Sequence, residues 1–526
     1  MVERVSSPRV LNRDDVVLYD GQLTLRNSTL TPRETMIEDL LFLRAVLVDA
    51  EIRFLLVRGD HDELVLVVDR EDRRALRLAL AAACQNEPFY SKPARLSQMG
   101  KPVKSDARQL ATLLADGSTT AGLKGRAFVL YRPRVEPKGN LSYGASEGVR
   151  LELWDFGAEE IEAPNPNAHM RHSLPRAEFV ESTVELHGQT WPTLHGMFDA
   201  LASDIRFDID MVFSWVDGAE LEWQRARARR MESYVVGEGD SSEARFRQLD
   251  ELKYALRSVN LFAPWIRNIY IVTDSPTPSW LDQHPRVRVV RSEEFFRNPS
   301  DLPTHNSHAV ESQLHNIPGI SEHFLYSNDD MFFGRTVHPE MFFSPGGISK
   351  FIEARTRIGP GESHVARSGF ENAARVNRRL LEKKFGKVIT RHLEHAATPL
   401  RTSVLQELER EFPDDFARTS ASAFRQATDI SVTNSLYHYY ALMTGRAVVQ
   451  EQAKVKYVDT TSHAGLAMMT SLLRKRSHDF FCLNDGSFPE ISVEDRATAV
   501  RSFLEDYFPI AAPWEKKAAA LTEQAL

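Results

Sequence analysis

The stretch Phe324–Gly334, which reads FLYSNDDMFFG, sets the first expectation for both the fold and the site. Its opening residues are apolar or aromatic, as is typical of a buried strand. Two adjacent carboxylates, Asp329 and Asp330, follow where that strand should end. Carboxylates among aromatic side chains require something positive to neutralise them, and oxygen ligands suit Mg²⁺ or Mn²⁺. An Asx-type turn whose carboxylates bond to nearby backbone amides explains the same pattern, so both interpretations stand at this point.

The sequence before this stretch alternates strand and helix patterns. Strands separated by helices predict an α/β fold with a doubly wound, mostly parallel sheet. Ligands of such sheets bind beyond the carboxyl ends of the strands, which is where Asp329 and Asp330 are expected. The expected strands are Ile209–Val216, Ile269–Val272, Val287–Val290 and Phe324–Ser327, and the expected helices are Gln248–Phe262 and Ser307–Asn316.

The flanking regions differ in character. Residues 1–200 show the pattern of a separate small α+β domain without a catalytic signature, and residues 205–350 form the expected α/β core. Residues 351–526 are expected to be mainly helical, without a strand series of their own, and to complete the active site. The expected elements outside the core are strands Ile52–Val57, Glu63–Val68, Ala127–Tyr131 and Val149–Leu153, and helices Met36–Asp49, Arg70–Ala83, Glu371–Lys384, Ser403–Glu411, Ser435–Met443, Leu466–Lys475 and Val493–Tyr507.

Composition narrows the class of protein. The chain has 526 residues and a formal net charge of −8, which argues against a general nucleic-acid binder. Its two cysteines, Cys84 and Cys482, are far apart in sequence, so we expect no disulfide framework. We expect the protein to work in a reducing compartment instead. No signal-peptide pattern and no membrane-spanning apolar run is visible. We therefore expect a cytoplasmic protein, with peripheral association at the inner face of a membrane and oligomer formation left open.

Several single residues are ambiguous when taken alone. Asp210 interrupts an apolar strand and must have a partner, either a nucleotide or a basic side chain. Trp215 and Asp217 follow that strand and are candidates for a base pocket, although an aromatic residue there is more often part of a core. Arg257 shares a helix face with other charged residues, which a solvated face explains equally well.

Four ordered blocks resemble the conserved regions of the Stealth family of sugar-phosphate transferases. That family includes bacterial capsule and exopolysaccharide phosphotransferases and the catalytic subunit of N-acetylglucosamine-1-phosphotransferase. The resemblance covers about residues 205–490. The blocks are Ile209–Gly218; Asp250–Ser258, Ala263–Thr273, Leu302–Thr304, Glu311-Ser312 and Asn328–Gly334; His395 through Phe412-Pro413 and Phe424-Arg425 to Tyr437–Tyr440; and Cys482–Asp485.

The resemblance implies a nucleotide-diphosphosugar-transferase-like fold and a reaction. A sugar 1-phosphate would pass from a nucleotide sugar, UDP-linked as in UDP-GlcNAc, to a hydroxyl of a glycan or polysaccharide acceptor. A phosphodiester would form and UMP would leave. The implied roles are Mg²⁺ or Mn²⁺ ligands at Asp329, Asp330 and Asp485, catalytic groups at His395, Glu311, Asp330 and Arg425, with His395 as general base, and donor-binding residues at Asp210, Trp215, Asp217 and Arg257.

Two other functions are compatible with parts of the pattern. A metal-dependent glycosyltransferase that releases UDP also uses an acidic pair after a strand. A non-catalytic glycan-binding or nucleotide-binding protein would not need His395 and Arg425 beside these acids.

Overall fold

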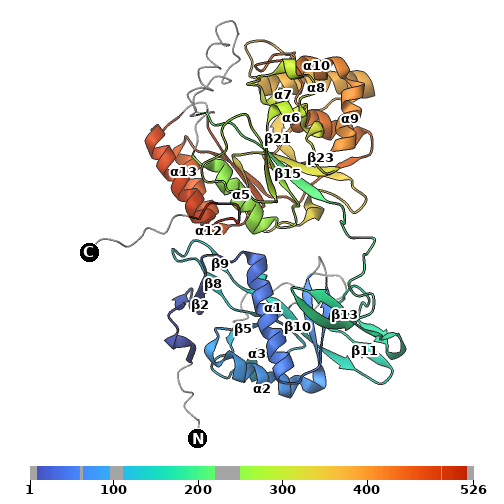
Figure 1. The fold of residues 1–526 in the computed structure, drawn as a ribbon, viewed down its shortest axis with the longest axis vertical. Helices are drawn as coiled ribbons and strands as arrows, with labels where there is room; N and C mark the ends of the chain where they lie inside the picture. Colours follow the sequence, from blue (N-terminus) through green and yellow to red (C-terminus); the bar gives the residue numbers. More distant parts are fainter. Residues whose placement is uncertain (1–8, 60–62, 95–110, 219–248, 487–488, 518–526) are drawn as a thin grey trace, which may run out of the picture. The chain divides into compact units, whose positions relative to one another are not determined.

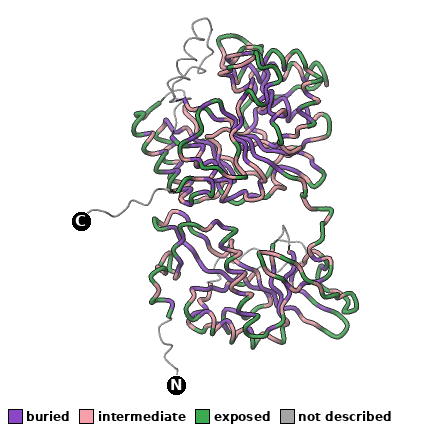
Figure 2. The backbone as a smooth tube through the Cα atoms, in the orientation of Figure 1, coloured by how far each residue is buried: buried purple, intermediate pink, exposed green. Residues whose placement is uncertain are grey.

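The computed structural model describes residues 9–59, 63–94, 111–218, 249–486 and 489–517. The chain forms two compact units, Met1–Leu201 and Ala202–Leu526 (Figure 1). The predicted segments 205–350 and 351–526 therefore lie in one unit. In each unit the most buried stretches of backbone are the strands and the helices packed on them (Figure 2). None of the helices in the described ranges is both long and apolar enough to cross a membrane.

The first unit is built on an eight-stranded mixed sheet with the order β12-β11-β10-β7-β5-β6, to which β3 and β4 attach through β10. The four strands predicted here are confirmed as β3 (Phe54–Arg58), β4 (Leu64–Asp69), β7 (Ala127–Tyr131) and β10 (Val149–Phe156). Helices α1 (Pro32–Asp49) and α2 (Arg73–Ala83) match the predicted helices, and Thr31 and Glu34 form a capping box at the start of α1. The remaining elements are β1 (Val16–Tyr19), β2 (Gln22–Arg26), β5 (Tyr90–Pro93), β6 (Thr112–Leu113), α3 (Thr119–Gly122), β8 (Arg134–Val135), β9 (Ser142–Tyr143), β11 (Glu160–Glu162), β12 (Ser173–Pro175), β13 (Glu181–Leu186) and β14 (Gln189–Leu194).

The second unit has a five-stranded central sheet with the order β17-β16-β15-β18-β23. Four strands are parallel, and the fifth, β23 (Thr398–Arg401), pairs antiparallel with β18. The predicted α/β fold with a mostly parallel sheet is confirmed. The parallel strands are β15 (Ile209–Ser214), β16 (Ile269–Val272), β17 (Val287–Val290) and β18 (His323–Asn328), and the helices between them are α5 (Glu251–Phe262), α6 (Ser292–Phe295) and α7 (Ser307–Glu311).

A second sheet begins where the first ends. Strand β19 (Met331–Phe333) pairs antiparallel with β26 (Phe480–Asn484), and β26 pairs parallel with β25 (Val455–Asp459). The turn at Asp329-Asp330 therefore passes the chain from the end of β18 directly into another sheet. Both sheets present strand ends at this turn.

The expectation that residues after 350 lack strands is wrong. Their strands are three to five residues long, and Pro399 lies in one and three charged residues lie in another, so neither gives an alternating apolar pattern. The strands are β20 (Ser349–Phe351), β21 (Glu353–Arg357), β22 (Arg391–Leu393), β23, β24 (Ala447–Val449), β25 and β26. The helices expected here are present as α8 (Gly369–Phe385), α9 (Thr402–Glu411), α11 (Tyr437–Met443), α12 (His463–Lys475) and α13 (Val493–Tyr507), with α10 (Pro413–Ser420) added.

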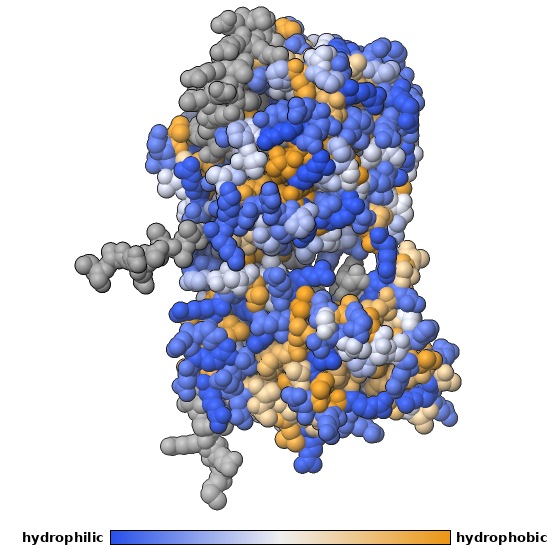
Figure 3. Space-filling view, in the orientation of Figure 1, coloured by the Kyte–Doolittle hydropathy of each residue, from blue (hydrophilic) through white to orange (hydrophobic). Residues whose placement is uncertain are grey.

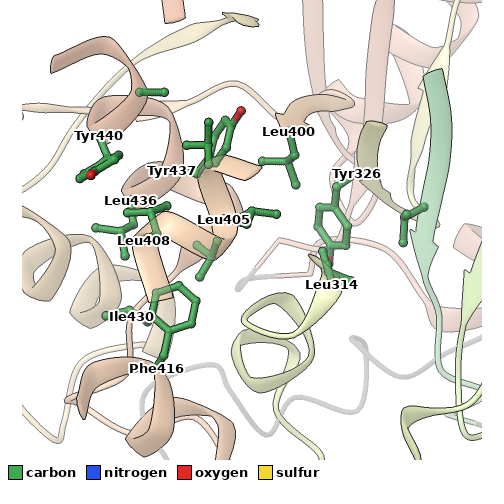
Figure 4. Close-up of a cluster of buried hydrophobic side chains, with 14 of the residues drawn as sticks. Leu314, Tyr326, Leu400, Leu405, Leu408, Phe416, Ile430, Leu436, Tyr437 and Tyr440 are labelled. Atoms are coloured by element: carbon green, nitrogen blue, oxygen red, sulfur yellow. The ribbon is translucent and has the colours of Figure 1, made fainter. Parts of the chain in front are cut away.

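A buried apolar cluster joins the central sheet to the helices that follow it. Figure 4 shows side chains from the central sheet and from α9, α10 and α11 converging. The outer surface of the face seen in Figure 3 is mainly hydrophilic, with scattered hydrophobic patches. The labelled members of the cluster are Leu314, Tyr326, Leu400, Leu405, Leu408, Phe416, Ile430, Leu436, Tyr437 and Tyr440.

One buried carboxylate, Asp429, fixes the loop that carries Arg425 against the start of α7. Its Oδ2 accepts hydrogen bonds from Asn306 Nδ2 and from the Gln426 backbone N–H, each at 2.8 Å. Its Oδ1 accepts from Ser422 Oγ at 2.9 Å. Asp429 is 0% exposed, and burial raises its pKa to about 6, although these hydrogen bonds oppose the rise.

This raised pKa predicts a pH dependence of stability. The stabilisation that Asp429 adds to the folded state is fully present below the pKa of the unfolded chain, near 3.9. It is lost as pH rises through the pKa of the folded state. Between pH 4.5 and 7.5 the unfolding free energy of the wild type should fall by about 2 kcal/mol relative to Asp429→Asn. Urea unfolding of both proteins at several pH values measures this difference. A difference that does not change with pH would contradict a buried, titrating Asp429.

Candidate active site

The acidic turn lies where the central sheet meets the sheet β19-β26-β25. The Leu483 backbone N–H donates to the Asp330 carbonyl oxygen at 2.9 Å, and Cys482 Sγ donates to Asp330 Oδ2 at 3.4 Å. Because Met331 pairs with Cys482, the turn lies beside the carboxyl end of β26, which Asp485 follows. Residues that are far apart in sequence, Asp330 and Asp485, are thereby brought to one edge.

The surroundings of Asp330 are strongly negative. The pKa of Glu251 is raised to about 7, mainly by burial and also by the charge of Asp330, although backbone hydrogen bonds and Arg496 oppose the rise. Burial likewise raises the pKa of Cys482, and Asp330 and Asp329 add to that rise. The pKa of Tyr457 is raised to about 12 by burial and by neighbouring acidic groups that include Asp330. Opposite charge is the factor that would stabilise this cluster, so a divalent cation fits its chemistry.

Asp485 is held by a basic residue from α13. Its Oδ1 forms an ion pair with Arg496 and accepts a hydrogen bond from Thr460 Oγ1 at 3.1 Å. Arg496 Nε donates to the same Thr460 Oγ1 at 2.8 Å. A cation ligated by Asp485 would share that carboxylate with Arg496.

A metal site made of protein groups alone is not preformed in the parts of the chain that the structure describes. No three or more His, Cys, Asp and Glu side chains there are grouped to hold a metal ion. Mg²⁺ is usually held by one or two carboxylates together with substrate phosphates and water. Asp329 and Asp330 suit that kind of site, in which the donor would supply the remaining oxygens.

Glu311 and Arg425 both lie close enough to Tyr326 of β18 to shift its pKa. Glu311 is 3% exposed, and burial raises its pKa while Thr433, whose Oγ1 donates to Oε2 at 2.7 Å, and the charge of Arg425 lower it. Burial and the charge of Glu311 raise the pKa of Tyr326, Arg425 lowers it, and Asp329 raises it. The structure thus brings together three predicted site residues, Glu311, Arg425 and Asp329.

His395 is connected to the turn through an aromatic neighbour. It follows β22, and its ring centroid lies 5.2 Å from that of Tyr457 in β25. Tyr457 is within electrostatic range of Asp330 and Asp485. His395 therefore contacts a strand of the second sheet whose Tyr457 is also near the acids that His395 was predicted to accompany.

Two of the predicted donor-binding residues lie at the correct edge of the central sheet. Trp215 and Asp217 follow β15, at the end where β18 reaches the acidic turn. The Trp215 backbone N–H donates to the Val272 carbonyl at 3.1 Å, and the Asp217 backbone N–H donates to Ser275 Oγ at 2.9 Å. Trp215 is 7% exposed, so most of its ring surface is already covered.

The other two have structural partners. Asp210 is at the opposite end of β15 and is 0% exposed; its carboxylate accepts from Arg267 Nε at 2.9 Å and Nη2 at 2.6 Å. Arg257 binds both carboxylate oxygens of Glu515, at 2.7 and 2.8 Å, and the Phe508 carbonyl at 2.7 Å. Asp210 lies near the start of β15, away from its carboxyl end, and Arg257 is bound to the C-terminal segment. These contacts favour the structural alternative for both residues over a nucleotide contact.

Sequence reasoning did not single out four residues of this region. Glu251 was visible only as one member of a quoted block, and Tyr326 had the pattern of an ordinary core residue. Tyr457 lies on a strand that the pattern did not predict. Arg496 gave no signal, because a basic residue on an amphipathic helix is normally solvated.

Four family models, described as Stealth protein conserved regions, match this chain in order. Region CR1 matches residues 207–235, CR2 residues 245–351, CR3 residues 394–442 and CR4 residues 470–525. All four matches fall in the second unit. Among solved structures, the galactosyltransferase LgtC shares 12% identity over 58% of this chain and 97% of its own, at a TM-score of 0.29, which is too low to support an inference.

Curated relatives match nearly the whole chain, including the first unit. The exopolysaccharide phosphotransferase CpsY of Mycobacterium tuberculosis is 57% identical over 97% of this chain and 94% of its own length. An exopolysaccharide phosphotransferase of Nocardia farcinica is 52% identical over 92% of this chain and 88% of its own. Exopolysaccharide phosphotransferase SCO6023 of Streptomyces coelicolor is 36% identical over 95% of this chain and 86% of its own. With four conserved regions in order around the acidic turn, this chain belongs to the Stealth family.

Proposed function

We propose that this chain is an exopolysaccharide phosphotransferase that moves a sugar 1-phosphate from a nucleotide sugar, UDP-linked, to a hydroxyl of a glycan acceptor. The observation that carries the proposal is the position of Asp329-Asp330. The pair directly follows a parallel strand. Asp330 acts electrostatically on Glu251, and Asp329 acts on Tyr326, as do Glu311 and Arg425. Phosphoryl transfer depends on positioning and on neutralising developing charge, and this arrangement supports both.

The donor would occupy the carboxyl edge of the central sheet. Trp215 and Asp217 would lie on the nucleotide side, and Asp329 and Asp330 would hold Mg²⁺ or Mn²⁺ on the diphosphate. The cation would neutralise the phosphate oxygens and orient them. Asp485, positioned by Arg496, would support the cation or the acceptor.

His395 would accept the proton of the acceptor hydroxyl. The acceptor oxygen then forms a bond to the β-phosphorus, and the bond from that phosphorus to the bridging oxygen breaks, so that UMP leaves. An imidazole suits this proton transfer because its unperturbed pKa is close to neutral pH. Arg425 would bind phosphate oxygens, and Glu311 would orient Arg425 or the acceptor hydroxyl. The product is a phosphodiester between sugar and acceptor.

The nature of the released nucleotide tests this reaction. A screen of nucleotide sugars with Mg²⁺ or Mn²⁺ and a glycan acceptor should release UMP and retain a β-phosphate label on the acceptor. Release of UDP with an unlabelled acceptor would instead mean glycosyl transfer. Absence of turnover with every donor, together with donor binding, would support a non-catalytic binding protein.

The role of Arg425 predicts a selective kinetic defect. Lysine keeps the charge but loses the planar fork that binds two phosphate oxygens at once, so Arg425→Lys should lower kcat/KM by about 10–100-fold. Arg379→Lys is the matched control, since Arg379 of α8 is exposed and its ion-pair partner is Glu362. Steady-state kinetics on both variants measure the effect. Equal activities of the two variants would remove Arg425 from the phosphate site.

A further inference from the structure

A basic segment follows the central sheet in this otherwise acidic chain. Residues 353–391 contain ten Lys and Arg against four Glu and no Asp, whereas the formal net charge of the whole chain is −8. The segment comprises β21, α8 and β22, and β21 pairs antiparallel with β22. The pairing gathers part of this charge on one two-stranded ribbon.

Several basic residues of this segment form ion pairs with acidic side chains, whereas two arginines of the ribbon do not. Arg375 pairs with Glu371 at 3.3 Å, and Lys384 pairs with Glu411. By contrast, Arg355 and Arg357 of β21 are exposed and form no ion pair within the described ranges. Arg391 of β22 does have an ion pair, with Glu353 of β21 at 3.6 Å.

Two of these arginines face each other. Arg357 of β21 is the Cα partner of Arg391 of β22. Like charges directly opposite on paired strands are destabilising, so this register has an electrostatic cost that a bound anion would remove. Guanidinium groups also match the geometry of phosphate oxygens, which makes a phosphate the favoured anion.

The ribbon continues directly into the site. Arg391 is in β22, and His395 follows the end of that strand. At about 3.3 Å per residue, the four residues from Arg391 to His395 span at most about 13 Å, a few sugar units. An anionic polymer bound at the ribbon could therefore extend to His395.

We propose that the β21–β22 ribbon, through Arg355, Arg357 and Arg391, binds phosphodiester groups already present in the acceptor polymer. The proposal rests on the proposed function, because each transfer adds one phosphodiester and so makes a growing chain polyanionic. An anionic membrane surface presents the same phosphate chemistry, and the binding test below distinguishes it from the polymer.

Direct binding tests this surface without relying on activity. Poly(glycerol phosphate) serves as a phosphodiester polymer, dextran as a neutral polymer and phosphatidylglycerol vesicles as an anionic membrane. The variant is Arg355→Gln with Arg357→Gln, and the matched control is Arg474→Gln with Lys475→Gln, two exposed basic residues at the end of α12. Both double variants remove the same charge from the same unit.

The wild type and the control should bind poly(glycerol phosphate), and the ribbon variant should bind it about tenfold more weakly at low salt. The difference should shrink as salt rises, because the contacts are ionic. All three proteins should show the same weak or absent binding to dextran. Equal polymer binding by the ribbon and control variants, or binding to the vesicles in preference to the polymer, would overturn the proposal.

Kinetic measurements on two acceptors distinguish a failure of polymer binding at the ribbon from a failure of the proposed transfer reaction. On a short uncharged acceptor the ribbon variant should keep wild-type turnover within about twofold, while its KM for a phosphodiester-bearing acceptor rises about tenfold, in line with loss of one to two ionic phosphate contacts. Equal losses on both acceptors would overturn the ribbon's role and leave the reaction intact. A wild-type protein that binds poly(glycerol phosphate) but transfers no sugar phosphate would contradict the reaction and leave the binding surface standing.

Discussion

The electrostatic cost of placing acidic groups together at the junction of two sheets is the constraint on which the site depends. Burial raises the pKa of Glu251, Cys482 and Tyr457, and the charge of Asp330 adds to each of these rises. Within one protein such a concentration of negative charge is unfavourable unless a positive group meets it. The chain supplies Arg496 on one side and Arg425 on the other, and a divalent cation would supply the rest.

The fold explains how distant residues reach this junction. Parallel strands bring Ser214, Val272 and Asn328 to one edge, and the turn then enters the second sheet. There, Asp485 follows strand β26 from the far end of the sequence. Asp429 connects the Arg425 loop to the helix that carries Glu311. The conserved regions recognised in the sequence are the pieces that this topology brings together.

The sequence predicted the central strands well because they are continuous apolar runs. It failed for β21, β22 and β25, because strands of three to five residues with charged or exposed side chains have no clear period. Asp210 was correctly seen as a residue in need of a partner, whereas a solvated helix face explained Arg257 equally well. A sequence pattern cannot tell a nucleotide from Arg267 or Glu515 as the partner. Arg496 could not be found, since its pairing with Asp485 depends on packing between distant segments.

The central claim is that Asp329 and Asp330 hold a divalent cation on the donor diphosphate. Anomalous diffraction from crystals grown with Mn²⁺ and a non-reactive UDP-sugar analogue tests it most directly. The account predicts a manganese peak within roughly 2–2.5 Å of a carboxylate oxygen of this turn and of the diphosphate oxygens. A diphosphate bound away from the carboxyl edge of the central sheet, or manganese bound without either aspartate, would contradict it.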